Sequence, residues 1–223
     1  MPVFSLKEAS VQNIANPKRN WMLVFFLGIG LLFCSRLVGA SLEKPEVMLQ
    51  HVTQQMLDAL RENESLLKTN PEKIVDLVDD ILVPHFESQD MAKWVVGRNA
   101  WLQASSDQRK QFTDEFKVLL IRTYATTLTA YTNQTVIYLP VRGDYTTKKR
   151  IQVSSIIRDP GKESIKIAYR LVQRDNQWKV YDIIIEGVSL LKGFQSQFSP
   201  DIQQYGLETL IQKIKQHNQK PLT

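Results

Sequence analysis

The chain is poor in the residues that usually mark catalysis and covalent cross-linking. It has one cysteine among 223 residues, Cys34, and only three histidines, at positions 51, 85 and 217. If residues 1–40 are removed on export, no thiol remains, which excludes disulfides, thiolate nucleophiles and cysteine-zinc sites from 41–223. The sequence also lacks an HExxH pair, a phosphate-binding glycine loop and a GxSxG elbow. These absences argue against the commonest enzyme classes.

The chain also lacks linker-like segments and a large excess of charge of one sign. The chain has nine glycines and nine prolines, and no stretch rich in Pro, Gly or Ser interrupts 41–223, which predicts one domain. Four of the 28 basic and one of the 23 acidic residues precede position 41, so the rest of the chain has a net charge of +2 rather than +5. Phosphate backbones are bound by an excess of positive charge. We therefore expect no nucleic-acid partner.

Residues 1–40 have the pattern of a signal peptide. Lys18 and Arg19 precede the uncharged run 21–33, and Val38-Gly39-Ala40 offers small residues where a signal peptidase cuts. A membrane-spanning helix needs about 20 apolar residues, so an uncleaved anchor is the less favoured alternative. We predict a signal peptide over 1–40 and one domain over 41–223.

Apolar residues recur every three and four positions through most of the first half of that domain. Helices are expected over residues 45–67, 74–82, 91–96 and 107–132. Asn70-Pro71-Glu72 is typical of a helix restart, and Ser105 with Gln108 has the spacing of a capping box.

After residue 134 the apolar period changes to two, which is typical of strands. Strands are expected near residues 135–139, 150–158, 165–171 and 178–186. Gly187 then ends the sheet, a helix follows to Gly206 with a kink at Pro200, and a last short helix covers 207–214. The expected fold is α+β, an antiparallel sheet of about four strands covered by several helices.

Three charged residues stand in otherwise apolar segments. Arg122 lies in the middle of the longest helix, and Asp182 and Glu186 lie in the last strand. Buried carboxylates are costly unless they are paired or solvated. We expect a structural ion pair between Arg122 and Asp182 or Glu186, rather than an acid–base pair for catalysis.

Four runs, spread in order through residues 45–215, carry a family resemblance. They are Asn70-Pro71 with Leu82-Val83-Pro84, the Gln108-Arg109 step before Phe112, the run from Phe116 to Ala125, and Tyr181-Asp182 with Glu186-Gly187-Val188-Ser189. These runs closely resemble the MlaC family, also called the toluene-tolerance auxiliary family.

That resemblance implies a periplasmic phospholipid carrier that maintains outer-membrane lipid asymmetry. Its partners would be an outer-membrane lipoprotein–porin complex and an inner-membrane ABC transporter complex. The resemblance implies no cofactor, with phospholipid bound as cargo, and no enzyme activity.

The interior of the domain can be interpreted in two ways. From the residues alone, the apolar stripes could pack into a solid core, because a stripe does not show whether it faces protein or ligand. The resemblance implies instead an apolar cavity for acyl chains between the sheet and the helices. The residues expected to bind lipid there are Leu77, Val78, Ile81, Leu82, Trp94, Val95, Leu120, Tyr124, Leu128, Ile165, Ile167, Tyr169, Tyr181, Ile183 and Ile185.

Two other classes of function remain open. A small α+β pocket enzyme would share the strands and the pocket but would need an acid–base pair inside it. A periplasmic chaperone for lipoproteins or polypeptides would need an open apolar groove rather than a closed cavity.

Overall fold

A computed structural model of the protein describes residues 42–129 and 134–222, and the predicted signal peptide lies outside these ranges. The first part of the domain is helical: α2 (Pro45–Glu62), α3 (Glu64–Thr69), α4 (Lys73–Ile81), the 3-10 turn η1 (Val83–His85), α5 (Ser88–Val96), α6 (Arg98–Gln103) and α7 (Ser106–Thr129). Five strands follow, β1 (Thr135–Tyr138), β2 (Arg150–Arg158), β3 (Ile165–Arg174), β4 (Gln177–Ile185) and β5 (Val188–Ser189), and α8 (Leu190–Asn218) comes last. Over the described ranges, no helix is long and apolar enough to cross a membrane.

The five strands form one antiparallel sheet whose spatial order is the order of the chain. The expected α+β class is confirmed, with one strand more than predicted. That strand, β5, pairs Val188 with Ile185 across a two-residue turn in which Glu186 and Gly187 both have positive φ. Two such residues make the tight turn that suits antiparallel neighbours. A strand of two residues is too short to show a period in the sequence.

Strand β4 contains a β-bulge at Tyr181. Leu171 of β3 pairs with Val180, and the adjacent Arg170 pairs with Asp182, so Tyr181 is an extra residue without a partner on β3. A bulge interrupts the strict alternation of side chains between the two faces of a strand. Consequently Trp178, Val180 and Ile183 all pack in one cluster with α2, although 180 and 183 differ in parity.

The helix ends agree with the sequence signals at several points. Ser105 Oγ accepts a hydrogen bond from Gln108 N, and Gln108 Oε1 accepts one from Ser105 N, each at 3.1 Å, so the predicted capping box is formed. The predicted helix 45–67 is broken at Asn63 into α2 and α3. In α8, the backbone leaves helical values at Gly206 (φ 79°, ψ 165°), where one helix was predicted to end and the last one to begin, and Pro200 lies inside the first arm.

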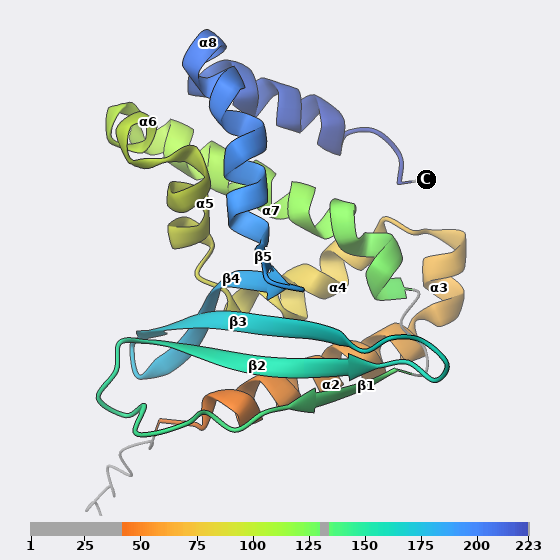
Figure 1. The fold of residues 1–223 in the computed structure, drawn as a ribbon. Helices are drawn as coiled ribbons and strands as arrows, with labels where there is room; N and C mark the ends of the chain where they lie inside the picture. Colours follow the sequence, from red (N-terminus) through yellow and green to blue (C-terminus); the bar gives the residue numbers. More distant parts are fainter. Residues whose placement is uncertain (1–41, 130–133, 223) are drawn as a thin grey trace, which may run out of the picture. The chain divides into compact units, whose positions relative to one another are not determined.

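The buried side chains of the helices and the sheet form three clusters. Helices α5, α6, α7 and α8 share a dense cluster that includes Val95, Trp101, Phe112, Leu191 and Ile211. Helix α2 lies along strands β1 and β2 in Figure 1, and its Met48, Leu49 and Val52 pack on the sheet residues Val153 and Leu171. A third cluster joins α2 to α4 and α7 through Met56, Ile74 and Ile121. The functional site lies where the sheet, α2 and α7 face one another.

Candidate functional site

A partly open cavity of about 370 Å³ lies between the sheet and the helices. Binding pockets for small molecules occupy about 300–1,000 Å³, so this cavity is at the lower end of that range. Helices α2, α4, α5 and α7, the segment 82–86, the sheet and the first residues of α8 all contribute to its wall. The lining is predominantly aliphatic, with few polar groups.

Strands β3 and β4 supply much of the cavity floor. Tyr169 pairs with Ile183, and Ile167 pairs with Ile185, so these four side chains stand on one face of the sheet. All four line the cavity. The period of two in the sequence predicted these four residues on the floor, but it also predicted Ile165 and Tyr181 there, which do not line the cavity.

Nine of the fifteen predicted lipid-binding residues line this cavity. They are Val78, Leu82, Leu120, Tyr124, Leu128, Ile167, Tyr169, Ile183 and Ile185. The other six, Leu77, Ile81, Trp94, Val95, Ile165 and Tyr181, are not part of its wall.

Each of these six has a definite place elsewhere. Leu77 and Ile81 belong to α4 and pack against the third cluster. Val95 is buried in the dense helical cluster. Trp94 and Ile165 are exposed. Tyr181 is turned away from the floor by the bulge, and the Arg150 guanidinium carbon lies 5.3 Å from the centroid of its ring.

Helix α2 is the largest part of the wall that sequence reasoning missed. Its lining residues are Met48, Leu49, Val52, Thr53, Met56, Leu57 and Leu60, a single stripe along the helix. The stripe was visible in the sequence as an amphipathic period. Nothing in that period showed that the stripe faces the sheet across the cavity.

The polar groups near the cavity are neutral or paired. Thr53 Oγ1 and Tyr138 Oη lie 2.6 Å apart and share a hydrogen bond. Burial raises the pKa of the Tyr138 hydroxyl and that of Tyr124. Lys117, at the cavity edge, has its Nζ 2.6 Å from Asp79 Oδ1. Burial lowers the pKa of His85, nearby Lys179 lowers it further, and Glu43 opposes both effects.

The predicted pairing of Arg122 with Asp182 or Glu186 is wrong. Arg122 is buried, with 7% of its side chain exposed, but its guanidinium binds Glu72 Oε2 at 2.6 Å and donates to the carbonyl of Lys220. The other Glu72 oxygen accepts from the backbone N–H of Leu222 at 2.8 Å. Arg122 and Glu72 therefore clamp the C-terminal segment onto α4 and α7. Glu186 instead accepts a hydrogen bond from the backbone N–H of Lys166.

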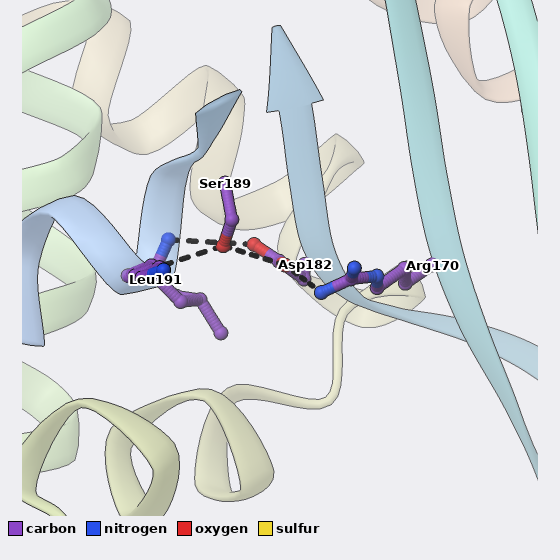
Figure 2. Close-up of polar contacts among 5 residues, drawn as sticks. Arg170, Asp182, Ser189 and Leu191 are labelled. Atoms are coloured by element: carbon purple, nitrogen blue, oxygen red, sulfur yellow. Dashed lines mark hydrogen bonds and ion pairs between the residues drawn. The ribbon is translucent and has the colours of Figure 1, made fainter. Parts of the chain in front are cut away.

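Asp182 has a different set of partners (Figure 2). Its carboxylate lies between the Arg170 guanidinium, at 3.0 Å, and the hydroxyl of Ser189, at 2.8 Å. The backbone N–H of Leu191 donates to the other oxygen at 3.3 Å. Asp182 is 2% exposed, and these contacts compensate the loss of its hydration. The group fixes the start of α8 on β4.

A second, more open hollow of about 770 Å³ lies beside the cavity. Helix α7, both arms of α8 and strand β5 line it. Three residues, Tyr124, Ile185 and Leu190, line both this hollow and the cavity, so the two spaces adjoin there. Within residues 42–129 and 134–222, no group of three or more His, Cys, Asp or Glu residues could hold a metal ion.

Comparisons with known proteins agree on one family. Residues 50–216 match the family described as MlaC protein. Toluene tolerance protein ttg2D of Pseudomonas putida is 26% identical over 79% of this chain and 81% of its own length. The intermembrane phospholipid transport system binding protein MlaC of Haemophilus influenzae is 26% identical over 92% of this chain and 95% of its own length.

A solved structure extends the comparison to three dimensions. It is a phospholipid-binding protein from Ralstonia solanacearum in complex with a phospholipid. The two structures superpose with a TM-score of 0.72 at 32% sequence identity, covering 79% of this chain and 97% of the other.

Proposed function

Since the chain belongs to the MlaC family, we propose that it is a periplasmic phospholipid carrier. It moves lipid between the outer and inner membranes and so helps to maintain outer-membrane lipid asymmetry. The observation that supports this role is the apolar cavity of about 370 Å³ between the sheet, α2 and α7. The similar protein from Ralstonia solanacearum, which holds a phospholipid, supports the same cargo.

The chemistry of the cavity wall suits such cargo. A diacyl lipid has about 30 methylenes, and exposing each to water costs about 0.8 kcal/mol, so a carrier must cover the tails almost completely. Apolar contact is non-directional and accepts chains of different length. Met48, Met56 and Met91 line the cavity, and unbranched thioether side chains fill irregular space readily. Binding and release, without catalysis, is the activity that we propose.

The remaining parts of the proposal concern delivery. Residues 1–40 serve as the signal peptide that brings the domain 41–223 to the periplasm. There the domain receives and delivers lipid at an outer-membrane lipoprotein–porin complex and an inner-membrane ABC transporter complex. Intact-mass measurement of the exported protein tests the first part, since a species that still contains residues 21–33 would contradict cleavage.

Native mass spectrometry of the exported protein tests lipid carriage. We expect a mass increment that dissociates as phospholipid, and we expect Ile183→Trp to reduce it because the indole occupies the cavity. Leu102→Trp is the matched control, since Leu102 is exposed and outside the cavity. A wild-type protein that carries no phospholipid would contradict the proposal. Turnover of a small substrate would favour a pocket enzyme, and bound polypeptide would favour a chaperone.

A further inference from the structure

One face of the sheet is turned toward the cavity and the other is turned away from it. Successive side chains along a strand point to opposite faces, so Ile157 and Ile167 line the cavity while Arg158 and Lys166 lie on the opposite face. Helix α2 packs on the cavity side, against Val153. The outer face consists of the even-numbered residues 150–158 of β2 and the residues that pair with them on β1 and β3.

Four basic residues stand on the outer face. Arg150, Arg158 and Lys166 are exposed, and within residues 42–129 and 134–222 no acidic side chain forms a salt bridge with any of them. Arg170 is the fourth, and it is bound to the buried Asp182. Three exposed cations are therefore free to bind an anion outside the protein.

Charge is divided unevenly between the two parts of the domain. Residues 134–189, which contain the sheet, have ten basic and six acidic side chains, whereas the helical residues 42–129 have ten basic and fourteen acidic ones. The net charges are thus +4 and −4. Near a negatively charged surface, such a distribution turns the sheet toward the surface and the first helices away from it.

We propose that the outer face is a docking surface for a bilayer that contains anionic phospholipid. Basic side chains near such a bilayer are attracted by its negative surface potential, and guanidinium and ammonium groups both bind phosphate oxygens. This inference goes beyond the proposed function, which concerns the cargo and the protein partners. Docking places the carrier at the surface from which a phospholipid cargo is taken.

The spacing of the cations suits a bilayer surface. Arg150 and Arg158 stand at the two ends of β2, eight residues and so about 26 Å apart, and Lys166 lies on the neighbouring strand. Between them, Ser154 and Ile156 are uncharged and only partly exposed, so the long basic side chains are the groups that reach outward. A layer of headgroups offers phosphates across the whole of such a face, whereas one cluster of carboxylates on a protein would meet only part of it.

The test is flotation of the exported protein with vesicles of phosphatidylcholine alone and of phosphatidylcholine mixed with phosphatidylglycerol. We expect strong binding only to the mixed vesicles, and we expect added salt to weaken it because ions screen exposed charges. Arg158→Gln/Lys166→Gln should weaken binding to the mixed vesicles by about 20-fold, since each basic residue near an anionic surface strengthens binding about 5-fold. Neither residue lines the cavity, so this variant should retain its bound phospholipid.

Arg98→Gln/Lys215→Gln is the matched control, because it removes the same two kinds of charge from exposed positions on α6 and α8. It should bind the mixed vesicles nearly as well as the wild type does, and both variants should keep the wild-type unfolding temperature because they exchange only exposed side chains. Equal weakening by the two variants would overturn the assignment to the outer face. A wild-type protein that does not float with the mixed vesicles would overturn docking altogether. A wild-type protein that floats with them but holds no phospholipid would overturn the proposed function and leave docking intact.

Discussion

The helical end of the domain and its sheet end are filled in different ways. At the helical end, the rings of Phe112, Phe116, Phe194 and Phe198 interlock, with centroids 5.3 to 6.4 Å apart. At the sheet end, aliphatic and methionine side chains surround a cavity. One helix, α7, serves both regions, with Phe112 in the dense cluster and Leu120 and Leu128 on the cavity wall.

The two ends of the domain therefore differ in how rigid they are and in how much ligand they can hold. Phe112 is fully buried among these rings, so a change of volume there is transmitted to its neighbours, whereas Phe194 and Phe198 also border the open hollow. Aliphatic side chains around a cavity lack neighbours on one side, so removing atoms there loses fewer contacts. We infer that the helical end holds the shape of the domain while the sheet end adapts to cargo.

The largest expected effect comes from truncating the dense end. Phe112 is 0% exposed, so Phe112→Ala should lower the free energy of unfolding by about 3–5 kcal/mol. Leu120→Ala, on the cavity side of the same helix, should cost less than about 2 kcal/mol, below the usual range for a packed leucine. Chemical denaturation of both variants without bound lipid measures the difference. Equal losses would show that the two ends do not differ in packing.

The contact between β4 and the start of α8, which joins the two regions, should have the next largest effect on stability. Asp182→Asn removes the charge that binds Arg170 and holds Ser189 and the start of α8. Hydrogen bonds to charged groups contribute about 1.5–3 kcal/mol, and we expect a loss of that size in thermal or chemical unfolding. Asp175→Asn, in the exposed β3–β4 turn, is the control. A variant as stable as the wild type would contradict the anchoring role.

The clamp that Arg122 and Glu72 form on the C-terminal segment tests how firmly the cavity side of the domain is held. Arg122→Leu leaves the Lys220 carbonyl without its donor, but Lys220 is exposed and its carbonyl can be hydrated instead, so we expect a loss of about 0.5–1.5 kcal/mol. Glu72 is 46% exposed and can be hydrated again, which limits the effect. Removal of residues 220–223 should destabilise the wild type but add little in Arg122→Leu. Additive losses would show that the arginine does not act through this segment.

The smallest expected effect is a pH dependence confined to the cavity side. The pKa of His85 is lowered in the folded protein by burial and by Lys179. The unfolded chain therefore binds the proton more readily, and stability should fall as the pH drops through the ordinary histidine pKa of about 6.5. His85→Gln should flatten this part of the stability profile. His217→Gln, in an exposed position, should leave it unchanged, and an unaltered profile in His85→Gln would exclude His85 as its source.

The predicted α+β class and most of the helices and strands came from short-range periods. Alternation in 165–171 and the stripe in 116–128 predicted Ile167, Tyr169, Leu120, Tyr124 and Leu128 as lining residues, and all five line the cavity. Each of these positions can be predicted from the repeat of apolar residues within its own helix or strand. Long-range packing decided the rest: Arg122 has Glu72 as its partner, 50 residues earlier and just before α4, and no local pattern distinguishes that carboxylate from Asp182.

The cavity itself was inferred from resemblance and not from residue pattern. The stripe of α2 has the same appearance in sequence as the stripe of a solid core. Whether Met48 and Val52 face protein or open space depends on the separation between α2 and α7, which is set by side chains from several elements. The hydrogen bond between Thr53 and Tyr138 was missed for the same reason, since α2 and β1 are brought together only by the tertiary fold.

The bulge at Tyr181 is one extra residue that shifts the alternation of side chains in β4. Upstream of it, even-numbered positions such as Trp178 and Val180 face the cavity side, whereas downstream the odd-numbered Ile183 and Ile185 do. Deleting this single residue would remove the bulge but leave the residues beyond it on their present faces, because Val180 and Asp182 would then pair consecutively with Leu171 and Arg170. The isoleucines would stay on the cavity floor and Asp182 would stay beside Ser189, so we expect both the cavity wall and the α8 anchor to survive the loss of Tyr181.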